Sequence, residues 1–319
     1  YFLRLRLNIV PRTVCHSFFE THSHSRLPGN SALHSVAPML QKLTSRTMAV
    51  VVALLLLSGA ALASAPKRIV SLNGSMTEIL FAIGAGDQVV GVDTSSIYPP
   101  RAQGLPKVGY QRKISAEGVL SLKPDLVIGT GEAGPPPVLQ QLRSSGVDLK
   151  LFEDKWTPES TYAKILFAGK HAGKEEQARA LVSRMKQAIA ALAKPEKEWR
   201  VLFIYARGPG MVQVSGSGTQ AHSMIELAGG KNAITGFNGF RPLTSEAMVG
   251  ANPEVILIPT RALASIGGID GLLRIPGVAL TDAGKNRRVI AMDDLLLLGF
   301  SSRLHIALRE LISELSALK

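Results

Sequence analysis

The sequence predicts an α/β protein with two lobes, each built around a central sheet, that are joined by one long helix. Short apolar runs bounded by turn residues recur along the chain, and such runs are typical of buried strands. Helical patterns alternate with these runs, which favours parallel or mixed sheets. The pattern of the first half also recurs in the second half. Together these three observations predict two similar lobes.

The N-terminal part of the chain differs from the rest. Residues 1–38 lack periodicity and contain four of the seven histidines and the only cysteine, so we interpret them as an upstream segment outside the working protein. Residues 39–63 follow the pattern of a secretory signal peptide, in which basic residues precede a short apolar run and small residues end at Ala63. We therefore expect cleavage after Ala63 and export to a bacterial periplasm.

Charge and cysteine content disfavour several classes of protein. Without residues 1–63 the chain loses six of its 36 basic and one of its 24 acidic residues, and the formal charge falls from +12 to +7. No dense basic run is interleaved with aromatic residues, so we expect no nucleic-acid partner. No cysteine would remain to form a disulfide or to carry a lipid.

Six apolar runs predict buried strands, and they are divided equally between the halves. They are residues 68–72, 89–92 and 124–128, then 201–205, 253–257 and 289–291.

Two further patterns repeat between the halves. Ser75-Met76-Thr77-Glu78 is echoed by Ser223-Met224-Ile225-Glu226, and we interpret each as a helix start with a Ser-x-x-Glu capping box. Glu117 stands seven residues before Pro124, and Glu246 stands seven residues before Pro253. In both places a short helix carries the glutamate and a proline precedes a buried strand.

Two helices connect the halves. Thr157 and Pro158 supply an N-cap and a first-turn proline for one helix, and Gly173 ends it. A second helix is predicted over residues 174–194, and some 20 residues at 1.5 Å each make a rod of roughly 30 Å. A single rigid rod predicts limited opening and closing. The domains are then an N-terminal lobe at 64–156, a helical linker at 157–196 that contains the backbone helix, and a C-terminal lobe at 197–319.

The most specific chemistry lies in a short segment around Tyr110. In an extended segment the side chains of Tyr110 and Arg112 point to the same side, so their polar ends can meet over one ligand. A phenol beside a fixed positive charge can be held as phenolate, which is a hard oxygen ligand for ferric iron. Taken alone, Tyr110 would be an ordinary surface tyrosine and Arg112 a solvated charge. Tyr98, on a neighbouring loop, is the competing tyrosine.

Residues 66–319 resemble the helical-backbone periplasmic substrate-binding proteins of ABC importers, a class that carries cobalamin, siderophores and haem. Within that class, the segment that includes Val90-Gly91-Val92-Asp93, Tyr98-Pro99-Pro100 and Val108-Gly109-Tyr110-Gln111-Arg112 resembles the haem-binding (hemin) subgroup. The resemblance implies a cleft between the lobes that captures ferric haem for an ABC-type import permease in iron acquisition. It also implies that Tyr110 ligates the iron and that Arg112 hydrogen-bonds the ligand oxygen.

The resemblance implies further roles. Some relatives hold a second haem through a histidine after the strand that matches residues 201–205, and Arg207 takes roughly that place here. We therefore expect one five-coordinate haem, with Arg207 and, as a further candidate, Arg241 contacting a propionate or closing the cleft. Glu117 and Glu246 match the exposed glutamates that dock such proteins onto permease arginines. We expect a monomer.

Other kinds of function stay open at this point. The same fold with a corrinoid or ferric siderophore as cargo would not need Tyr110 on the iron. A metal-ion carrier would need several converging ligands, whereas His171, His222 and His305 are far apart in sequence, with His222 a candidate distal contact. An enzyme is not expected, because a carboxylate pair on separate lobes would exceed the separation of at most about 9.5 Å that glycoside hydrolysis tolerates.

Overall fold

The computed structural model describes residues 65–208 and 210–318. They belong to one compact unit, Ser64–Lys319. The upstream segment and the signal peptide interpreted within residues 1–63 therefore lie outside the described residues. Among the helices of the described ranges, none is long and apolar enough to cross a membrane.

The N-terminal sheet contains four parallel strands in the order β2-β1-β5-β6. Alternate residues of a strand point to opposite faces, and Ile69 and Val70 of β1 accordingly enter different apolar cores. Helices α2 and α6 cover the first face, and α4 and α5 cover the second. The bounds are β1 (Ile69–Leu72), α2 (Gly74–Ala82), β2 (Val89–Val92), α3 (Pro100–Gln103), α4 (Ala116–Ser121), β5 (Leu126–Thr130), α5 (Pro136–Ser144) and β6 (Asp148–Phe152).

A two-stranded hairpin, β3 (Gly109–Tyr110) and β4 (Lys113–Ile114), lies beside the end of β2. The Thr94 N–H donates to the Gly109 carbonyl at 2.8 Å, which fixes the hairpin to the loop that follows β2. Gly109 has φ +105°, and a Cβ there would lie 2.7 Å from the Lys113 carbonyl oxygen. Position 109 therefore requires glycine, because both the backbone conformation and the space exclude a side chain.

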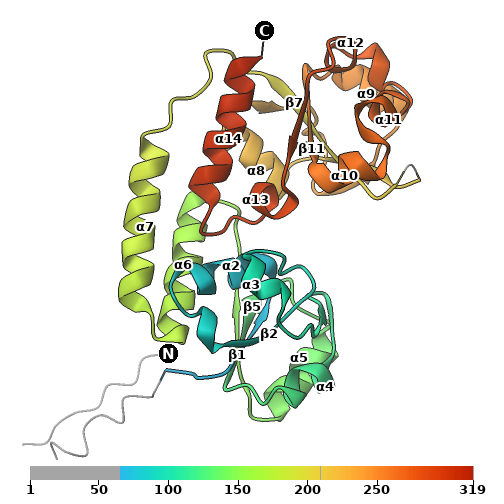
Figure 1. The fold of residues 1–319 in the computed structure, drawn as a ribbon. Helices are drawn as coiled ribbons and strands as arrows, with labels where there is room; N and C mark the ends of the chain where they lie inside the picture. Colours follow the sequence, from blue (N-terminus) through green and yellow to red (C-terminus); the bar gives the residue numbers. More distant parts are fainter. Residues whose placement is uncertain (1–64, 209, 319) are drawn as a thin grey trace, which may run out of the picture. The chain divides into compact units, whose positions relative to one another are not determined.

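Helices α6 (Pro158–Ala172) and α7 (Glu175–Ala190) form the connection. The Thr157 hydroxyl caps α6 by accepting from the Ser160 N–H at 3.1 Å, and Gly173 ends the helix in the left-handed conformation. Figure 1 shows α7 lying alongside α6 and the C-terminal helix α14 (Leu304–Ala317). The α7 helix ends at Ala190, before the predicted residue 194, because the Leu192 N–H bonds the Ile189 carbonyl in a tighter last turn.

The C-terminal sheet has the order β10-β8-β7-β11-β12, with β9 pairing β7. Strands β7, β9, β11 and β12 are parallel, whereas β8 and β10 add antiparallel pairs. Helices α8, α13 and α14 cover one face, and α9 to α12 cover the other. The bounds are β7 (Arg200–Ala206), β8 (Val212–Ser215), α8 (Gln220–Leu227), β9 (Lys231–Asn232), β10 (Phe240–Pro242), α9 (Ser245–Ala251), β11 (Val255–Pro259), α10 (Thr260–Ser265), α11 (Gly268–Leu273), α12 (Asp282–Lys285), β12 (Val289–Met292) and α13 (Asp294–Leu298).

The predicted fold class is confirmed: two α/β parts, each with a central sheet, are joined by a helical connection. All six predicted strands are present. Among the strands of four or more residues, the predictions missed β6 and β8, whose alternating polar and apolar residues form less continuous apolar runs than those of the central strands. They also missed the shorter strands β3, β4, β9 and β10.

Both predicted capping boxes are wrong, because each helix begins earlier than expected. Asn73 caps α2 and Thr219 caps α8, so Ser75 and Ser223 lie inside their helices. Glu78 is buried instead, and its carboxylate accepts from the Ser302 hydroxyl at 2.9 Å. Arg303 also donates to Glu78 at 2.6 Å, so this carboxylate ties α2 to the start of α14.

Candidate functional site

Polar residues line a cavity of about 500 Å³ that both sheets contribute to. Thr94 and Ser96 follow β2 of the N-terminal sheet, whereas Arg261 and Asp293 follow β11 and β12 of the C-terminal sheet. These positions are the carboxyl ends of parallel strands, where open α/β sheets bind their ligands. Because Thr94 also hydrogen-bonds Gly109, the cavity begins next to the hairpin that carries Tyr110.

The hairpin brings together the two residues that the sequence singled out. The Arg112 Nη1 donates to the Tyr110 hydroxyl oxygen at 3.0 Å, and the guanidinium carbon lies 5.9 Å from the centre of the ring. Arg112 is the second residue of a two-residue turn, so the extended geometry expected for this segment is wrong even though the two groups meet. The Tyr110 side chain stays accessible, with 38% of the residue exposed.

A carboxylate holds the other side of the Arg112 guanidinium. Glu132 follows β5, and its Oε1 accepts from Arg112 Nη2 at 2.7 Å. Its Oε2 accepts from Gln111 Nε2 at 3.1 Å. Burial alone would lower the pKa of Arg112, but the adjacent Glu132 and Tyr110 oxygens raise it above its ordinary value. The guanidinium is therefore a permanent cation placed against the phenol. Sequence analysis missed Glu132, although a charged residue directly after a buried strand was a usable signal.

A second tyrosine–arginine pair with the same spacing lies at the carboxyl end of β7. Arg207 Nε donates to the Tyr205 hydroxyl oxygen at 2.7 Å. The Tyr205 ring packs edge-on against Phe240 of β10, with ring centres 6.4 Å apart. Sequence analysis assigned Tyr205 only to a buried strand, and the repeated Tyr-x-Arg spacing was the signal that would have found it.

The two remaining arginine candidates are not brought to Tyr110. The Arg241 guanidinium lies 4.6 Å from the centre of the Phe237 ring, and Arg207 is engaged with Tyr205. Among the described residues, neither arginine forms a hydrogen bond or an ion pair with the Tyr110–Arg112 pair.

Two further cations face the cavity. Lys107 donates to the Ala102 carbonyl at 2.9 Å, and burial lowers its pKa while Asp93 opposes the shift. The Arg261 Nε lies 3.4 Å from Asp294 Oδ2. Burial raises the pKa of Asp294, and Arg261 counteracts this. The cavity thus offers positive groups from both sheets, and sequence analysis named neither of them.

Tyr98, the competing tyrosine, is engaged elsewhere. Its ring covers the Arg303 guanidinium, with the guanidinium carbon 3.6 Å from the ring centre. Arg303 in turn pairs with buried Glu78. Tyr98 therefore serves the contact between α2 and α14, although 39% of the residue is exposed.

Glu117 and Glu246 occupy equivalent places. Each is exposed in the first turn of a short helix, and each follows its helix cap by two residues. Ser115 caps α4 by accepting from Gly118 N–H, and Thr244 caps α9 by accepting from Ala247 N–H, both at 3.1 Å. Within the described residues neither glutamate forms an ion pair, so both carboxylates are available at the surface.

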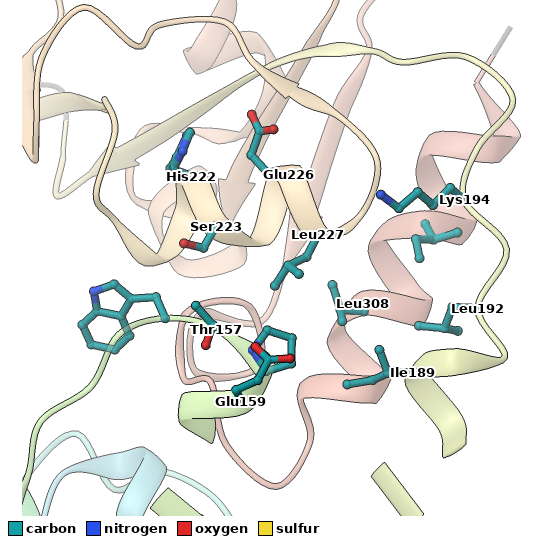
Figure 2. A pocket seen from close by; sticks show the side chains of 13 residues that line it. Thr157, Glu159, Ile189, Leu192, Lys194, His222, Ser223, Glu226, Leu227 and Leu308 are labelled. Atoms are coloured by element: carbon teal, nitrogen blue, oxygen red, sulfur yellow. The ribbon is translucent and has the colours of Figure 1, made fainter. Parts of the chain in front are cut away.

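The histidines lie apart from these groups. His222 lines a second cavity of about 530 Å³, between α8, the end of α7, the start of α6 and α14. Figure 2 shows His222 and Glu226 on α8, with Ile189, Leu192 and Leu308 on the opposite wall. His171 packs on Phe167, and His305 lies on α14. Over residues 65–208 and 210–318 no group of three or more His, Cys, Asp or Glu is placed to hold a metal ion.

Comparison with known proteins gives the family. The model of the periplasmic binding protein family matches residues 69–296, which is most of the chain. The chain belongs to the periplasmic binding protein family. This membership indicates a substrate-binding protein that acts outside the cytoplasm.

Solved structures of this family resemble the chain over nearly their whole length. The periplasmic haem-binding protein RhuT from Roseiflexus sp. RS-1 is 45% identical with a TM-score of 0.75, and the match covers 78% of this chain and 98% of RhuT. BhuT, solved in complex with two haems, is 40% identical with a TM-score of 0.73 over the same shares. HutB of Vibrio cholerae, also a periplasmic haem-binding protein, is 35% identical with a TM-score of 0.69, over 76% of this chain and 95% of HutB.

Two curated relatives match the chain at lower identity than RhuT and BhuT. The substrate-binding lipoprotein YvrC of Bacillus subtilis is 33% identical over 60% of this chain, and the chain spans only 63% of its length. A vitamin B12-binding protein of Photorhabdus laumondii is 27% identical, over 61% of this chain and 71% of that protein.

Proposed function

We propose that this protein captures ferric haem between its two sheets and delivers it to the permease of an ABC importer. The observation that carries the proposal is the Tyr110 hydroxyl held 3.0 Å from Arg112 on an accessible hairpin. Tyrosine is an established axial ligand of haem iron. A free phenol has a pKa of about 10, so a neighbouring cation and the ferric ion are both needed to keep it deprotonated at neutral pH.

Haem fits better than a corrinoid or a siderophore. Those cargoes are recognised through peripheral groups and would leave the phenol–guanidinium pair without a use. The haem-binding proteins RhuT and BhuT are 45% and 40% identical to this chain, whereas the B12-binding relative from Photorhabdus is 27% identical. The cations Lys107 and Arg261 give the cavity groups that suit the carboxylates of haem propionates.

Tyr205 is a second candidate oxygen ligand. Its hydroxyl receives a hydrogen bond from Arg207 as Tyr110 does from Arg112, and it lies at the carboxyl end of the other sheet. BhuT, a similar protein, was solved in complex with two haems, which is consistent with room for a second haem here. On this proposal Arg207 supports a tyrosine ligand and does not contact a propionate, and a second haem binds more weakly than the first.

Docking and location complete the proposal. Glu117 and Glu246 would contact arginines of the two permease subunits, because each is exposed on an equivalent helix and forms no ion pair with the rest of the described chain. The same proposal includes export by a signal peptide at residues 39–63 and a periplasmic location. It also includes lobe boundaries near residues 157 and 196 and a monomeric state. Reversing the charge of both glutamates should abolish haem uptake by cells and leave haem binding intact, and normal uptake would refute the docking role.

The first test is a visible-absorption titration of the protein with ferric haem. The wild type should bind tightly with a high-spin tyrosinate spectrum, and Tyr110→Phe should lose that spectrum. The affinity loss should exceed the roughly 10–100-fold that removing an outer partner of a metal ligand costs. Tyr98→Phe is the matched control, because its ring can still cover Arg303. No specific haem binding by the wild type would overturn the proposal and favour a corrinoid or siderophore.

A further inference from the structure

Glu132 makes two contacts that together fix the turn beside Tyr110. One carboxylate oxygen accepts from Arg112 at 2.7 Å, and the other accepts from Gln111 at 3.1 Å. Gln111 and Arg112 are the two turn residues of the hairpin, and of these two Arg112 donates to the Tyr110 hydroxyl. A single carboxylate therefore holds both residues of the turn.

The charge of Glu132 argues for a role in geometry. A negative carboxylate near Tyr110 opposes a phenolate there, so electrostatics alone would favour a neutral residue at position 132. The Arg112 side chain is 54% exposed and has many rotamers, so a second partner is needed to keep it on the phenol. The planar guanidinium can satisfy both partners at once, with Nη2 on the carboxylate and Nη1 on the hydroxyl.

We infer that Glu132 is a positioning residue for haem capture, which holds Arg112 against the Tyr110 hydroxyl. The inference rests on the proposed role of Tyr110 as the iron ligand. Glu132 does not touch the iron in this account, and its effect passes through the guanidinium.

The support for the turn continues into the connecting helices. Gln111 accepts from the Asn73 amide, and Asn73 Oδ1 accepts from the Ser75 hydroxyl at 2.6 Å. Ser75 in turn accepts from Lys164 Nζ at 3.3 Å. Lys164, on α6, forms an ion pair with Asp154, and their side chains are only 0% and 3% exposed. A buried ion pair with these bonds is rigid, so the turn is anchored to the first helix of the connection.

The test compares two substitutions of Glu132 with one nearby control. Glu132→Ala should weaken ferric-haem binding by about tenfold and raise the pH at which the tyrosinate spectrum is half lost. Glu132→Gln should keep most of the wild-type affinity and most of the wild-type pH midpoint, because its amide oxygen still accepts from Arg112. Glu153→Ala should match the wild type, since this substitution removes a nearby carboxylate that is exposed beside Gly131 and lies outside this network. If Glu132 acted only through its negative charge, both Glu132 variants would bind haem more tightly than the wild type. That result would overturn the inference.

A double-mutant comparison tests whether Glu132 acts through Arg112. In the Arg112→Ala background, Glu132→Ala should cause no further weakening of haem binding. Weakening of the same size in both backgrounds would also overturn the inference. Thermal unfolding of each variant shows whether the fold is retained.

A measurement without haem separates this inference from the proposed function. In side-chain ¹⁵N NMR of the haem-free protein, rotation of the Arg112 guanidinium should be hindered in the wild type and free in Glu132→Ala. An Arg112 signal that is equally hindered in both would overturn the positioning role. A wild type that shows the hindered signal but binds no haem would overturn the proposed cargo and leave the positioning of Arg112 intact.

Discussion

Two tyrosine–arginine pairs with the same spacing occur in different local structures. Tyr110 and Arg112 lie on a hairpin with a two-residue turn beside the N-terminal sheet, with a hydroxyl to Nη1 distance of 3.0 Å. Tyr205 and Arg207 lie at the end of a central strand of the C-terminal sheet, with a hydroxyl to Nε distance of 2.7 Å. The same Tyr-x-Arg pattern therefore produces the same contact on two unlike backbones.

The pairs differ in what supports them. Arg112 is held from behind by Glu132, whose carboxylate belongs to a network of side chains. In the part of the chain that the structure describes, Arg207 forms no ion pair, and Tyr205 is instead placed by its strand and by Phe240. The Tyr110–Arg112 pair is thus held by hydrogen bonds around its arginine. The Tyr205–Arg207 pair is held by the sheet around its tyrosine. Changes to the arginine should matter more in the first site, and changes to ring packing more in the second.

The largest expected effect concerns the number of haems. With excess ferric haem, the wild type should take up a second, weaker equivalent, and Tyr205→Phe should lose it while keeping the first tyrosinate spectrum. Tyr110→Phe should lose the first. Equilibrium titration followed by gel filtration measures the bound haem per chain. Saturation at one equivalent in both the wild type and Tyr205→Phe would show that the two pairs are not equivalent ligands, and would support the single haem expected from the sequence.

A smaller effect should follow from replacing each arginine by lysine. Lysine keeps the charge but cannot reach two partners with a planar fork. Arg112→Lys should therefore weaken the first haem by about tenfold, the low end for an outer partner of a metal ligand. Arg207→Lys should weaken the second haem less, because Tyr205 is the one side-chain partner of Arg207 among the described residues. Equal losses at both sites would show that the contact of Glu132 with Arg112 adds nothing to haem binding.

The sequence carried enough information to predict the fold class and one of these contacts. Short continuous apolar runs predicted the central strands, because both faces of each sheet are buried. The contact of Arg112 with Tyr110 is local, and the spacing of the two residues already indicated that their polar ends could meet. The backbone that produces the contact was not predicted, because Gly109 starts a hairpin whose partner strand has only two residues.

Other features depend on tertiary neighbours and were beyond the sequence patterns. Glu132 lies 20 residues from Arg112, and only the place of the hairpin at the end of the sheet brings them together. Glu78 matched a capping box, but it is buried against the start of α14, more than 220 residues away. Tyr205 could have been identified because it precedes Arg207 by two residues, as Tyr110 precedes Arg112. It was assigned only to a buried strand because it ends a continuous apolar run.

The smallest expected effect tests the packing of Tyr205. Its ring meets Phe240 edge-on, and a contact of this kind contributes about 0.5–1.5 kcal/mol. Phe240→Leu keeps an apolar side chain but removes the ring, so the second haem should bind roughly threefold more weakly. The first haem should be unaffected, because Tyr110 depends on Arg112 and Glu132, which are on the other sheet. Titration of the second equivalent measures the effect, with thermal unfolding as the control for the fold. An equal loss of affinity for the first haem would mean that the two tyrosine–arginine pairs are coupled through the bound haems. The conclusion that each pair is supported independently would then be wrong.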